Sequence, residues 1–224
     1  MQDIQACLSR APIFSRLSEA DRNQLASIAQ KRTFEKGEVI CWQGETWPMA
    51  AYLASGQAEW AMLSPDGKRQ VVFKLQACDV VWSHSILDDQ PMPASLEVKE
   101  TALVYLWPRE TIMPFVSRST EAVWDVSRVL LRYMRRVREV VYGFAFHPVA
   151  GRLARLLLEH YQPVKGQPTP RNLTLDEMAE TVGTTRELVS RTLHRFADEG
   201  LIQINRMEFV FKNPDALEDL ASQR

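Results

Sequence analysis

A short run of polar residues near the C-terminus has the side-chain types that recognise bases in DNA. It contains two arginines, a glutamate and a serine within six positions. Arginine can donate two hydrogen bonds to O6 and N7 of guanine, and glutamate can accept one from the amino group of cytosine. We expect these side chains to share the outer face of a helix whose N-terminal end enters the major groove. They are Arg186, Glu187, Ser190 and Arg191, with Thr185 before them.

Two short helices joined at Gly183 would position this run. Thr174 and Glu177 have the spacing of a capping box, which predicts where the first helix begins. Apolar residues then recur at helical spacing on both sides of the glycine. They are Leu175, Met178, Ala179 and Val182 in the first helix and Leu188, Val189, Leu193 and Phe196 in the second. This pattern predicts a helix-turn-helix, and the alternating residues 201–213 predict a β-hairpin, or wing, after it.

His84 is a second residue with chemistry suited to a site. It is the only histidine before residue 147, and imidazole is a suitable axial ligand for haem iron. A histidine bonded to a backbone carbonyl, or exposed in a loop, explains the same sequence. Because the chain shows no Ser-His-Asp order, metal-ligand spacing or phosphate-binding glycine loop, we do not expect an enzyme.

The first half of the chain alternates short apolar segments with glycine turns. Strands are expected at 38–42, 50–54, 57–63, 68–75 and 95–106. Turns are expected at Gly37, Gly44, Gly56 and 64–67. Many short strands with regular turns predict a sandwich or barrel.

A long helix is expected from about Ser119 to Phe144. Its apolar residues are alternately three and four positions apart, which is a heptad pattern. They are Val123, Val126, Leu130, Tyr133, Val137, Val140 and Phe144. The spacing alone leaves two interpretations open: a helix packed on its own barrel, and a coiled coil with a second copy.

Composition indicates an ordinary globular protein of two domains. The chain has 224 residues, of which 46% are hydrophobic, and a formal net charge of −1. Attraction to DNA must therefore come from a local patch. Cytoplasmic location is expected, because no apolar run reaches membrane-spanning length and the N-terminus lacks a signal peptide's apolar region. Cys7, Cys41 and Cys78 are far apart and predict neither a disulfide framework nor a metal knuckle.

These features together resemble the CRP/FNR family of bacterial transcription regulators. The C-terminal run matches both the Arg-Glu-x-x-x-Arg pattern of catabolite-activator-like members and the Glu-x-x-Ser-Arg pattern of FNR-like members. The order FEKGEVICWQGE, YLASGQAEW and PDGKRQVVFKL is similar to the family's cyclic-nucleotide-binding barrel. The resemblance implies an α+β fold with an N-terminal jelly-roll β-barrel, a long dimerisation helix and a C-terminal winged helix-turn-helix.

The resemblance also implies roles for individual segments. Arg186, Glu187 and Arg191 would contact bases, with Ser190 as a further candidate, and Thr185 would contact a phosphate. The long helix would pair with its copy through the heptad residues, so that two recognition helices about one DNA turn apart bind a palindrome. The segment 142–148 would be the interdomain hinge, and the exposed loop at 164–171 a surface for RNA polymerase.

The residues that bind cyclic AMP in this family are replaced here. By alignment, Ser83 stands where a glutamate holds the ribose, and Pro93 where an arginine pairs with the cyclic phosphate. Losing that arginine removes a charge-assisted bidentate contact. Val137 and Arg138 stand where hydroxyl residues contact the base. We therefore expect an effector other than cyclic AMP.

Two other cofactors occur in this family, an iron–sulfur cluster and haem. The FNR iron–sulfur cluster needs several cysteines near the N-terminus, and Cys7 stands alone there, so a cluster is not expected. In carbon-monoxide-sensing haem members the ligating histidine aligns with His84. Their companion cysteine is replaced by Trp82, and their N-terminal proline ligand has no counterpart in this chain. Effector contacts are expected from Trp82, Ser83, His84 and Val137, with His84 as the iron ligand if haem is the cofactor.

The expected organisation has three parts. They are a sensor barrel with N-terminal helices at 1–117, a dimerisation helix and hinge at 118–146, and a winged-helix DNA-binding domain at 147–224. The expected function is binding of double-stranded DNA by a homodimer at a palindromic TGTGA- or TTGA-like site, under control of an unidentified small-molecule effector. Two alternatives are a haem-based gas sensor that uses His84, and a ligand-independent regulator whose barrel is only a scaffold.

Overall fold

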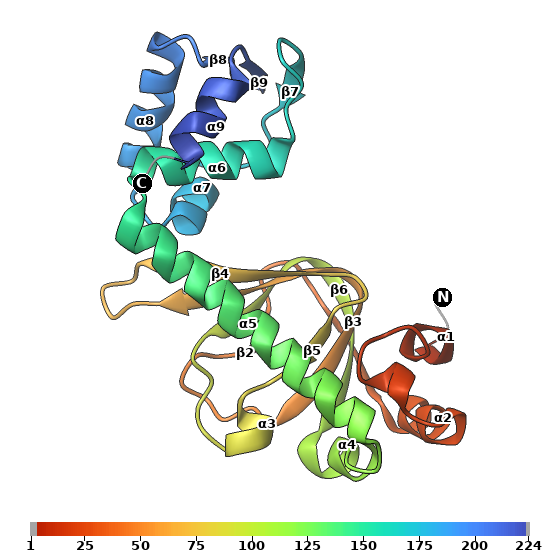
Figure 1. Cartoon of the computed structure of the whole chain (residues 1–224). Helices are drawn as coiled ribbons and strands as arrows, with labels where there is room; N and C mark the ends of the chain where they lie inside the picture. The colour runs from red at the N-terminus through yellow and green to blue at the C-terminus, as the bar shows by residue number, and fades with distance from the viewer. Residues whose placement is uncertain (1–3, 223–224) are drawn as a thin grey trace. The chain divides into compact units, whose positions relative to one another are not determined.

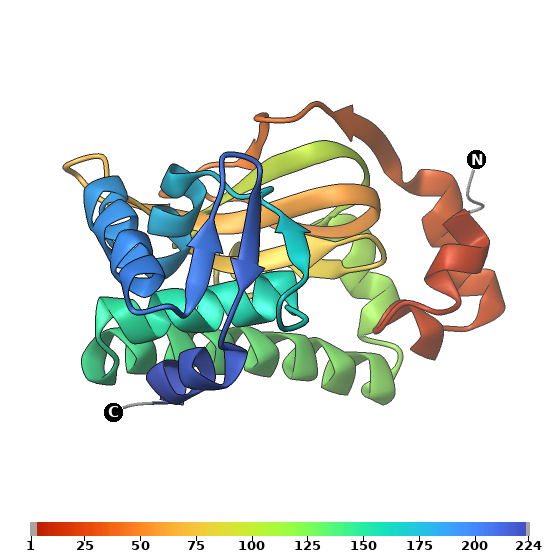
Figure 2. The same ribbon diagram turned by 90° about the horizontal axis from the view of Figure 1, so that it is seen from above.

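The computed structural model describes residues 4–222, drawn in Figure 1 and turned by 90° in Figure 2. Its internal contacts divide the chain into two compact units. The first unit contains the residues up to Pro65 and Val71–Val137, and the second contains Asp66–Gln70 and the residues from Arg138 onward. Among the described residues, no helix combines the length and the apolar character that a membrane span requires.

The first unit is built on an antiparallel sheet with the strand order β1-β6-β3-β4, in which β2 also pairs with β6 and β5 with β3. The strands are β1 (Gln30–Phe34), β2 (Val39–Cys41), β3 (Met49–Leu63), β4 (Arg69–Gln76), β5 (Val80–Trp82) and β6 (Ser95–Pro108). The two strands expected at 50–54 and 57–63 are one strand, β3, whose register against β6 shifts around Gly56. Gly56 has a φ of +85°, so it bends the strand without ending it.

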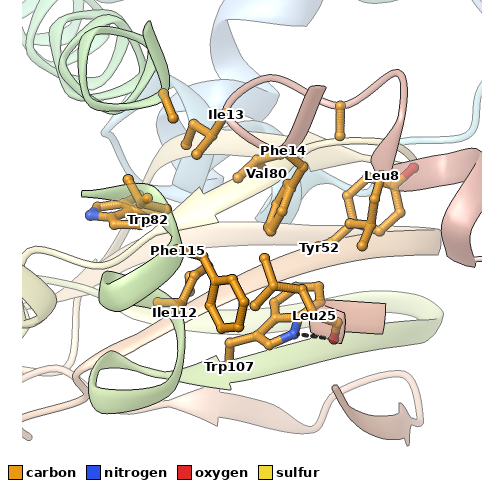
Figure 3. Close-up of a cluster of buried hydrophobic side chains, with 14 of the residues drawn as sticks. Leu8, Ile13, Phe14, Leu25, Tyr52, Val80, Trp82, Trp107, Ile112 and Phe115 are labelled. Atoms are coloured by element: carbon orange, nitrogen blue, oxygen red, sulfur yellow. Dashed lines mark hydrogen bonds between the residues drawn. The ribbon is translucent and has the colours of Figure 1, made fainter. Parts of the chain in front are cut away.

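Helices pack against this sheet over a buried aromatic layer. They are α1 (Ile4–Leu8), the 3-10 turn η1 (Phe14–Arg16), α2 (Glu19–Ile28), α3 (Ser85–Asp88), α4 (Arg109–Val116) and the first part of α5 (Thr120–Phe146). Figure 3 shows this layer, in which Nε1 of Trp107 donates to the carbonyl oxygen of Leu25 at 2.9 Å. The ring centres of Phe14 and Trp107 lie 5.0 Å apart. A second apolar cluster, which includes Trp60, lies among residues of the sheet itself.

The long helix α5 carries two apolar stripes where the sequence suggests one. Val126 is buried in the core of the first unit, and Leu130 and Tyr133 pack against that core. The Tyr133 hydroxyl donates to the carbonyl oxygen of Val80 at 3.3 Å. These three members of the expected heptad therefore pack on their own barrel.

A different stripe of α5 remains exposed. Trp124 is 62% exposed and Met134 is 68% exposed. The exposed α5 stripe consists of Trp124, Leu131, Met134 and Val141, with Val123, Val137 and Phe144 exposed beside it. Val140 is half-buried. Heptad spacing could not separate the two stripes, because residues of both recur every seven positions and lie side by side on the helix.

Asp125 ties η1 to α5 through a nearly buried carboxylate. Nε of Arg16 lies 2.8 Å from Oδ2 of Asp125, and Arg128 binds the other carboxylate oxygen. Burial alone would raise the pKa of Asp125. The hydrogen bonds and charges of the two arginines outweigh burial, so the pKa lies below its usual value.

Replacing Asp125 with asparagine should destabilise the chain at neutral pH and flatten its acid dependence. A carboxyl whose folded pKa is lowered stabilises the fold fully above its unfolded pKa, and this contribution disappears as pH falls through the folded pKa. Because both arginine side chains are more than half exposed, solvent weakens the interaction, and we expect a loss of about 1 kcal/mol. Urea unfolding from neutral pH to about pH 2 measures the effect. A wild-type advantage that did not shrink in acid would contradict the ionic role.

The second unit surrounds a small core with helices and a three-stranded sheet of order β7-β9-β8. Its elements are α6 (Val149–Tyr161), β7 (Pro168–Pro170), α7 (Leu175–Val182), α8 (Arg186–Asp198), β8 (Ile202–Ile204), β9 (Glu208–Phe211) and α9 (Pro214–Ser222). Strands β8 and β9 form the expected wing. The expected loop at 164–171 contains β7, whose prolines are tolerated because it lies at the edge of the sheet. Helices α7 and α8 form the helix-turn-helix. Together with the two sheets and the long helix α5, they confirm the α+β fold class.

Candidate DNA-binding site and sensor residues

The helix-turn-helix begins and turns as the sequence predicts. Thr174 and Glu177 form the capping box at the start of α7, and α7 ends at Gly183, whose φ of +71° is left-handed. Oγ1 of Thr185 accepts a hydrogen bond from N of Leu188 at 3.3 Å, so α8 begins at Arg186. The buried face of α8 consists of Val189, Thr192, Leu193 and Phe196. Burial of this face leaves the predicted DNA-contacting residues on the other side.

The five predicted contact residues lie together at the N-terminal end of α8. Thr185, Arg186, Glu187 and Arg191 are exposed, and Ser190 is half-buried. Nη1 of Arg186 lies 3.1 Å from Oδ2 of Asp176 on α7, and both side chains are more than half exposed. Exposed ion pairs contribute little free energy, so Arg186 can exchange this carboxylate for a base or a phosphate.

Glu187 is held in its ionised form at this surface. Its pKa is lowered first by a hydrogen bond from its own backbone amide and then by one from the side chain of Thr185, with further help from Arg186 and Arg191. An ionised carboxylate only accepts hydrogen bonds. The site therefore combines one acceptor with two guanidinium donors, which are the groups that distinguish cytosine and guanine edges in the major groove.

Arg152 on α6 holds the turn of the helix-turn-helix in place. Its Nε donates to the carbonyl oxygen of Val182 at 2.9 Å, and its Nη1 donates to that of His147 at 2.8 Å. Its guanidinium lies 4.9 Å from the ring centre of Phe144. A cation at the C-terminal end of α7 satisfies carbonyls that have no partner within the helix and matches the helix dipole.

Sequence patterns did not identify Arg152 as a structural residue. The available signal was its place beside the buried Leu153 and Ala154 at the start of an amphipathic helix. An arginine there is ordinarily interpreted as a solvated side chain. Only the fold shows that backbone carbonyls from two other segments meet at its guanidinium.

Ser83 serves the backbone of the barrel. It is fully buried. Its Oγ accepts from N of Met49 at 3.2 Å and from N of Ile86 at 3.3 Å, at the start of α3. Pro93, at the position where cyclic-AMP binders have an arginine, is exposed. Neither residue offers the contact that a ribose or a cyclic phosphate needs, so the residues present do not fit cyclic AMP.

The other expected effector residues differ in their exposure. Trp82 is 1% exposed and belongs to the aromatic layer between sheet and helices, where Figure 3 shows it. His84 is exposed before α3, with its ring centre 6.3 Å from that of Tyr133. Val137 is 47% exposed on α5. Within residues 4–222, no cluster of three or more His, Cys, Asp or Glu side chains could hold a metal ion.

Comparison with known families identifies both halves of the chain. Residues 31–119 match the model of the cyclic nucleotide-binding domain, and residues 151–220 match that of the Crp-like helix-turn-helix domain. The CRP-like cAMP-activated global transcriptional regulator of Mycobacterium tuberculosis is 25% identical over 215 residues, covering 94% of this chain and 96% of that protein. The cyclic AMP receptor protein of Thermus thermophilus is 25% identical over 212 residues, covering 94% and 97%.

Solved structures show the same fold. A CRP/FNR-family transcriptional regulator from Eubacterium rectale has a TM-score of 0.77 at 20% identity, covering 94% of this chain and 97% of that one. The c-di-GMP-responsive global regulator CLP of Xanthomonas campestris has a TM-score of 0.75 at 15% identity, covering 87% and 99%. These relatives are transcriptional regulators and not enzymes. The chain belongs to the CRP/FNR family of DNA-binding transcriptional regulators.

Proposed function

We propose that this regulator binds a palindromic TGTGA- or TTGA-like DNA site as a homodimer, through Thr185, Arg186, Glu187, Ser190 and Arg191 of each α8. The observation that carries the proposal is the exposed N-terminal end of α8, where two guanidinium groups flank an ionised carboxylate. Thr185 is suited to a phosphate contact because it stands at the first turn, where backbone amides also attract anions. The base-contacting roles of Arg186, Glu187 and Arg191 follow from their donor and acceptor types.

Dimerisation is proposed through the exposed α5 stripe. Trp124, Leu131, Met134 and Val141 are separated by seven, three and seven residues, which is the spacing of a two-stranded coiled coil. Val123, Val137 and Phe144, expected from the sequence to pair, are exposed beside it and would contribute at its edges. A dimer presents two recognition helices to successive major grooves, which is the geometry that a palindrome requires.

The signal is proposed to be an effector other than cyclic AMP. Ser83 and Pro93 support this, because one is committed to backbone hydrogen bonds and the other carries no charge. Haem bound through His84, and a barrel that binds no ligand, remain the alternatives. An absorption spectrum of protein expressed with haem supplied separates them: a Soret band lost in His84→Ala would support haem. RNA polymerase contact through the segment 164–171 is part of the same proposal for activation.

Selection from random double-stranded DNA tests the proposed function. We expect the purified full chain to enrich inverted repeats whose half-sites lie about 10 base pairs apart, centre to centre. Enrichment follows from two α8 helices that bind one duplex together. If the selected sequences contain only a single unrepeated motif, or no motif, the dimeric recognition model is wrong.

A charge placed on the exposed α5 stripe provides the control. Met134→Glu should convert the dimer to a monomer in sedimentation velocity and abolish enrichment of inverted repeats, because a buried unpaired carboxylate opposes pairing. Arg132→Glu adds the same negative side chain to another exposed face of α5 and should leave the dimer intact. Equal effects of both variants would point to general helix damage and not to an interface.

A further inference from the structure

Two cysteines that are distant in the sequence meet at one hydroxyl group in the first unit. Cys7 lies in α1, and Cys78 lies in the turn between β4 and β5. Burial, and then hydrogen bonding with the thiols of Cys78 and Cys7, raise the pKa of the buried Tyr52 hydroxyl, so both cysteines lie beside it. Figure 3 shows Tyr52 beside Leu8, the residue after Cys7. Both cysteines therefore lie beside the same hydroxyl group, although the sequence predicted no disulfide.

The backbone fixes Cys78 at this position. Tyr52 pairs with Val80 across β3 and β5. Next to that pair, N of Cys78 donates to the carbonyl oxygen of Leu53 at 2.7 Å, and N of Leu53 donates to that of Asp79 at 3.0 Å. The turn is therefore an extension of the sheet, and it fixes the backbone of Cys78 next to the Tyr52–Val80 pair.

Cys78 also has an unfavourable backbone conformation. Its φ is +76°, in the left-handed region that glycine adopts without cost and other residues rarely adopt. Strained residues of this kind concentrate at functional sites. Glycine would be more stable here, so folding stability does not explain the cysteine.

The three cysteines differ in how far solvent can reach their side chains. Cys78 is exposed, Cys7 is half-buried against the aromatic layer, and Cys41 is 3% exposed within the sheet. Burial raises the pKa of Cys41 to about 12, which suppresses the thiolate, the reactive form of cysteine. An oxidant in solution therefore reaches Cys78 first, with Cys7 close enough to respond.

From this geometry we infer that Cys7 and Cys78 are a peroxide-oxidised dithiol that closes to a disulfide. Hydrogen peroxide transfers one oxygen to the Cys78 thiolate, giving a sulfenic acid and, after proton uptake by the leaving hydroxide, one water. The Cys7 sulfur then attacks the sulfenic sulfur. The S–S bond forms, the S–O bond breaks, and a second water leaves. Overall, two thiols are oxidised and one peroxide is reduced to two waters.

A disulfide needs the sulfurs at about 2.05 Å, so both must turn away from the Tyr52 hydroxyl toward each other. Reduction by a thiol reverses the reaction. The site is chemically independent of the proposed DNA contacts and of any effector in the barrel.

Thiol labelling of the full chain tests this inference. Fully reduced protein is treated with hydrogen peroxide, unfolded in denaturant, alkylated with N-ethylmaleimide, digested without reductant and analysed by mass spectrometry. We expect one maleimide adduct, on Cys41, in place of three, together with a Cys7–Cys78 cross-linked peptide that disappears after reduction. Cys41→Ser should give the same cross-link. In Cys7→Ser, a dimedone adduct should accumulate on Cys78.

Cys78→Gly is the second variant, and it keeps the test decisive because it should fold. It removes the left-handed strain, so it should unfold at a higher temperature than the wild type while losing the cross-link and leaving Cys7 accessible to maleimide. The inference is overturned if wild-type Cys78 is oxidised to sulfinic acid with Cys7 still alkylated. A cross-link that joins two chains, or that uses Cys41, overturns it as well.

Discussion

Replacing Arg191 by alanine should weaken binding to the selected DNA site by about 5- to 150-fold, equivalent to roughly 1–3 kcal/mol. Arg191 is exposed in the first half of α8, where its guanidinium can donate two hydrogen bonds to guanine. Removing it should also relax the preference at one base pair in each half-site. Fluorescence anisotropy with the selected site, and with each base of a half-site substituted in turn, measures both effects.

Arg195→Ala is the matched control for this loss of charge. Arg195 lies about one turn further along α8, is exposed, and has Nε 3.7 Å from the carboxylate of Glu199. We expect it to change affinity much less and to leave base preference intact. If Arg191→Ala weakened all DNA sequences equally, Arg191 would be a phosphate contact, and the assignment of base recognition to it would be wrong.

Replacing Gly56 by alanine should destabilise the first unit by about 3 kcal/mol, the sum of left-handed strain and overpacking. A Cβ at this position would lie 2.4 Å from the carbonyl oxygen of Thr101 and 2.7 Å from Cα of Ala102. These are backbone atoms of β6, the strand that pairs with β3, and they cannot move without breaking the pairing. The melting temperature should fall by about 10 °C.

Gly44→Ala separates the two components of that cost. Gly44 also has a left-handed φ, +85°, but a Cβ there would meet no atom within 4 Å. It should therefore lose only about 1 kcal/mol, from strain alone. Thermal unfolding of both variants gives the comparison. Equal losses would mean that the close approach of β6 contributes nothing, contrary to the geometry around Gly56.

Local signals were strong enough to predict the DNA-binding half of the chain. The capping box at Thr174, the left-handed Gly183 and the cap at Thr185 depend on neighbours within three residues, so the sequence contains all the information that they need. The exposed face of α8 was predictable as well, because the apolar positions identify the buried side and the exposed residues lie opposite. The wing was predictable for the same reason, since alternation around a turn is a local pattern.

Long-range contacts set the limit of prediction in the sensor half. Nothing near Tyr133 in the sequence shows that its hydroxyl meets the carbonyl of Val80, so the choice between core and dimer stripe could not be made from spacing. Ser83 presented the same difficulty, because its two backbone donors come from Met49 and Ile86. Cys7 and Cys78 are the extreme case, because a helix and a turn far apart in the sequence bring them to Tyr52.

The contacts of Arg152 determine where the molecule can bend. One guanidinium joins the carbonyl of His147, just after α5, to that of Val182 in the helix-turn-helix. The segment 142–148, expected from the sequence to be a flexible joint, is therefore attached to the DNA-binding unit and must rotate with it. The two units divide at Val137, within the continuous helix α5. The part of α5 that follows Val137 is therefore a lever arm that belongs to the DNA-binding unit.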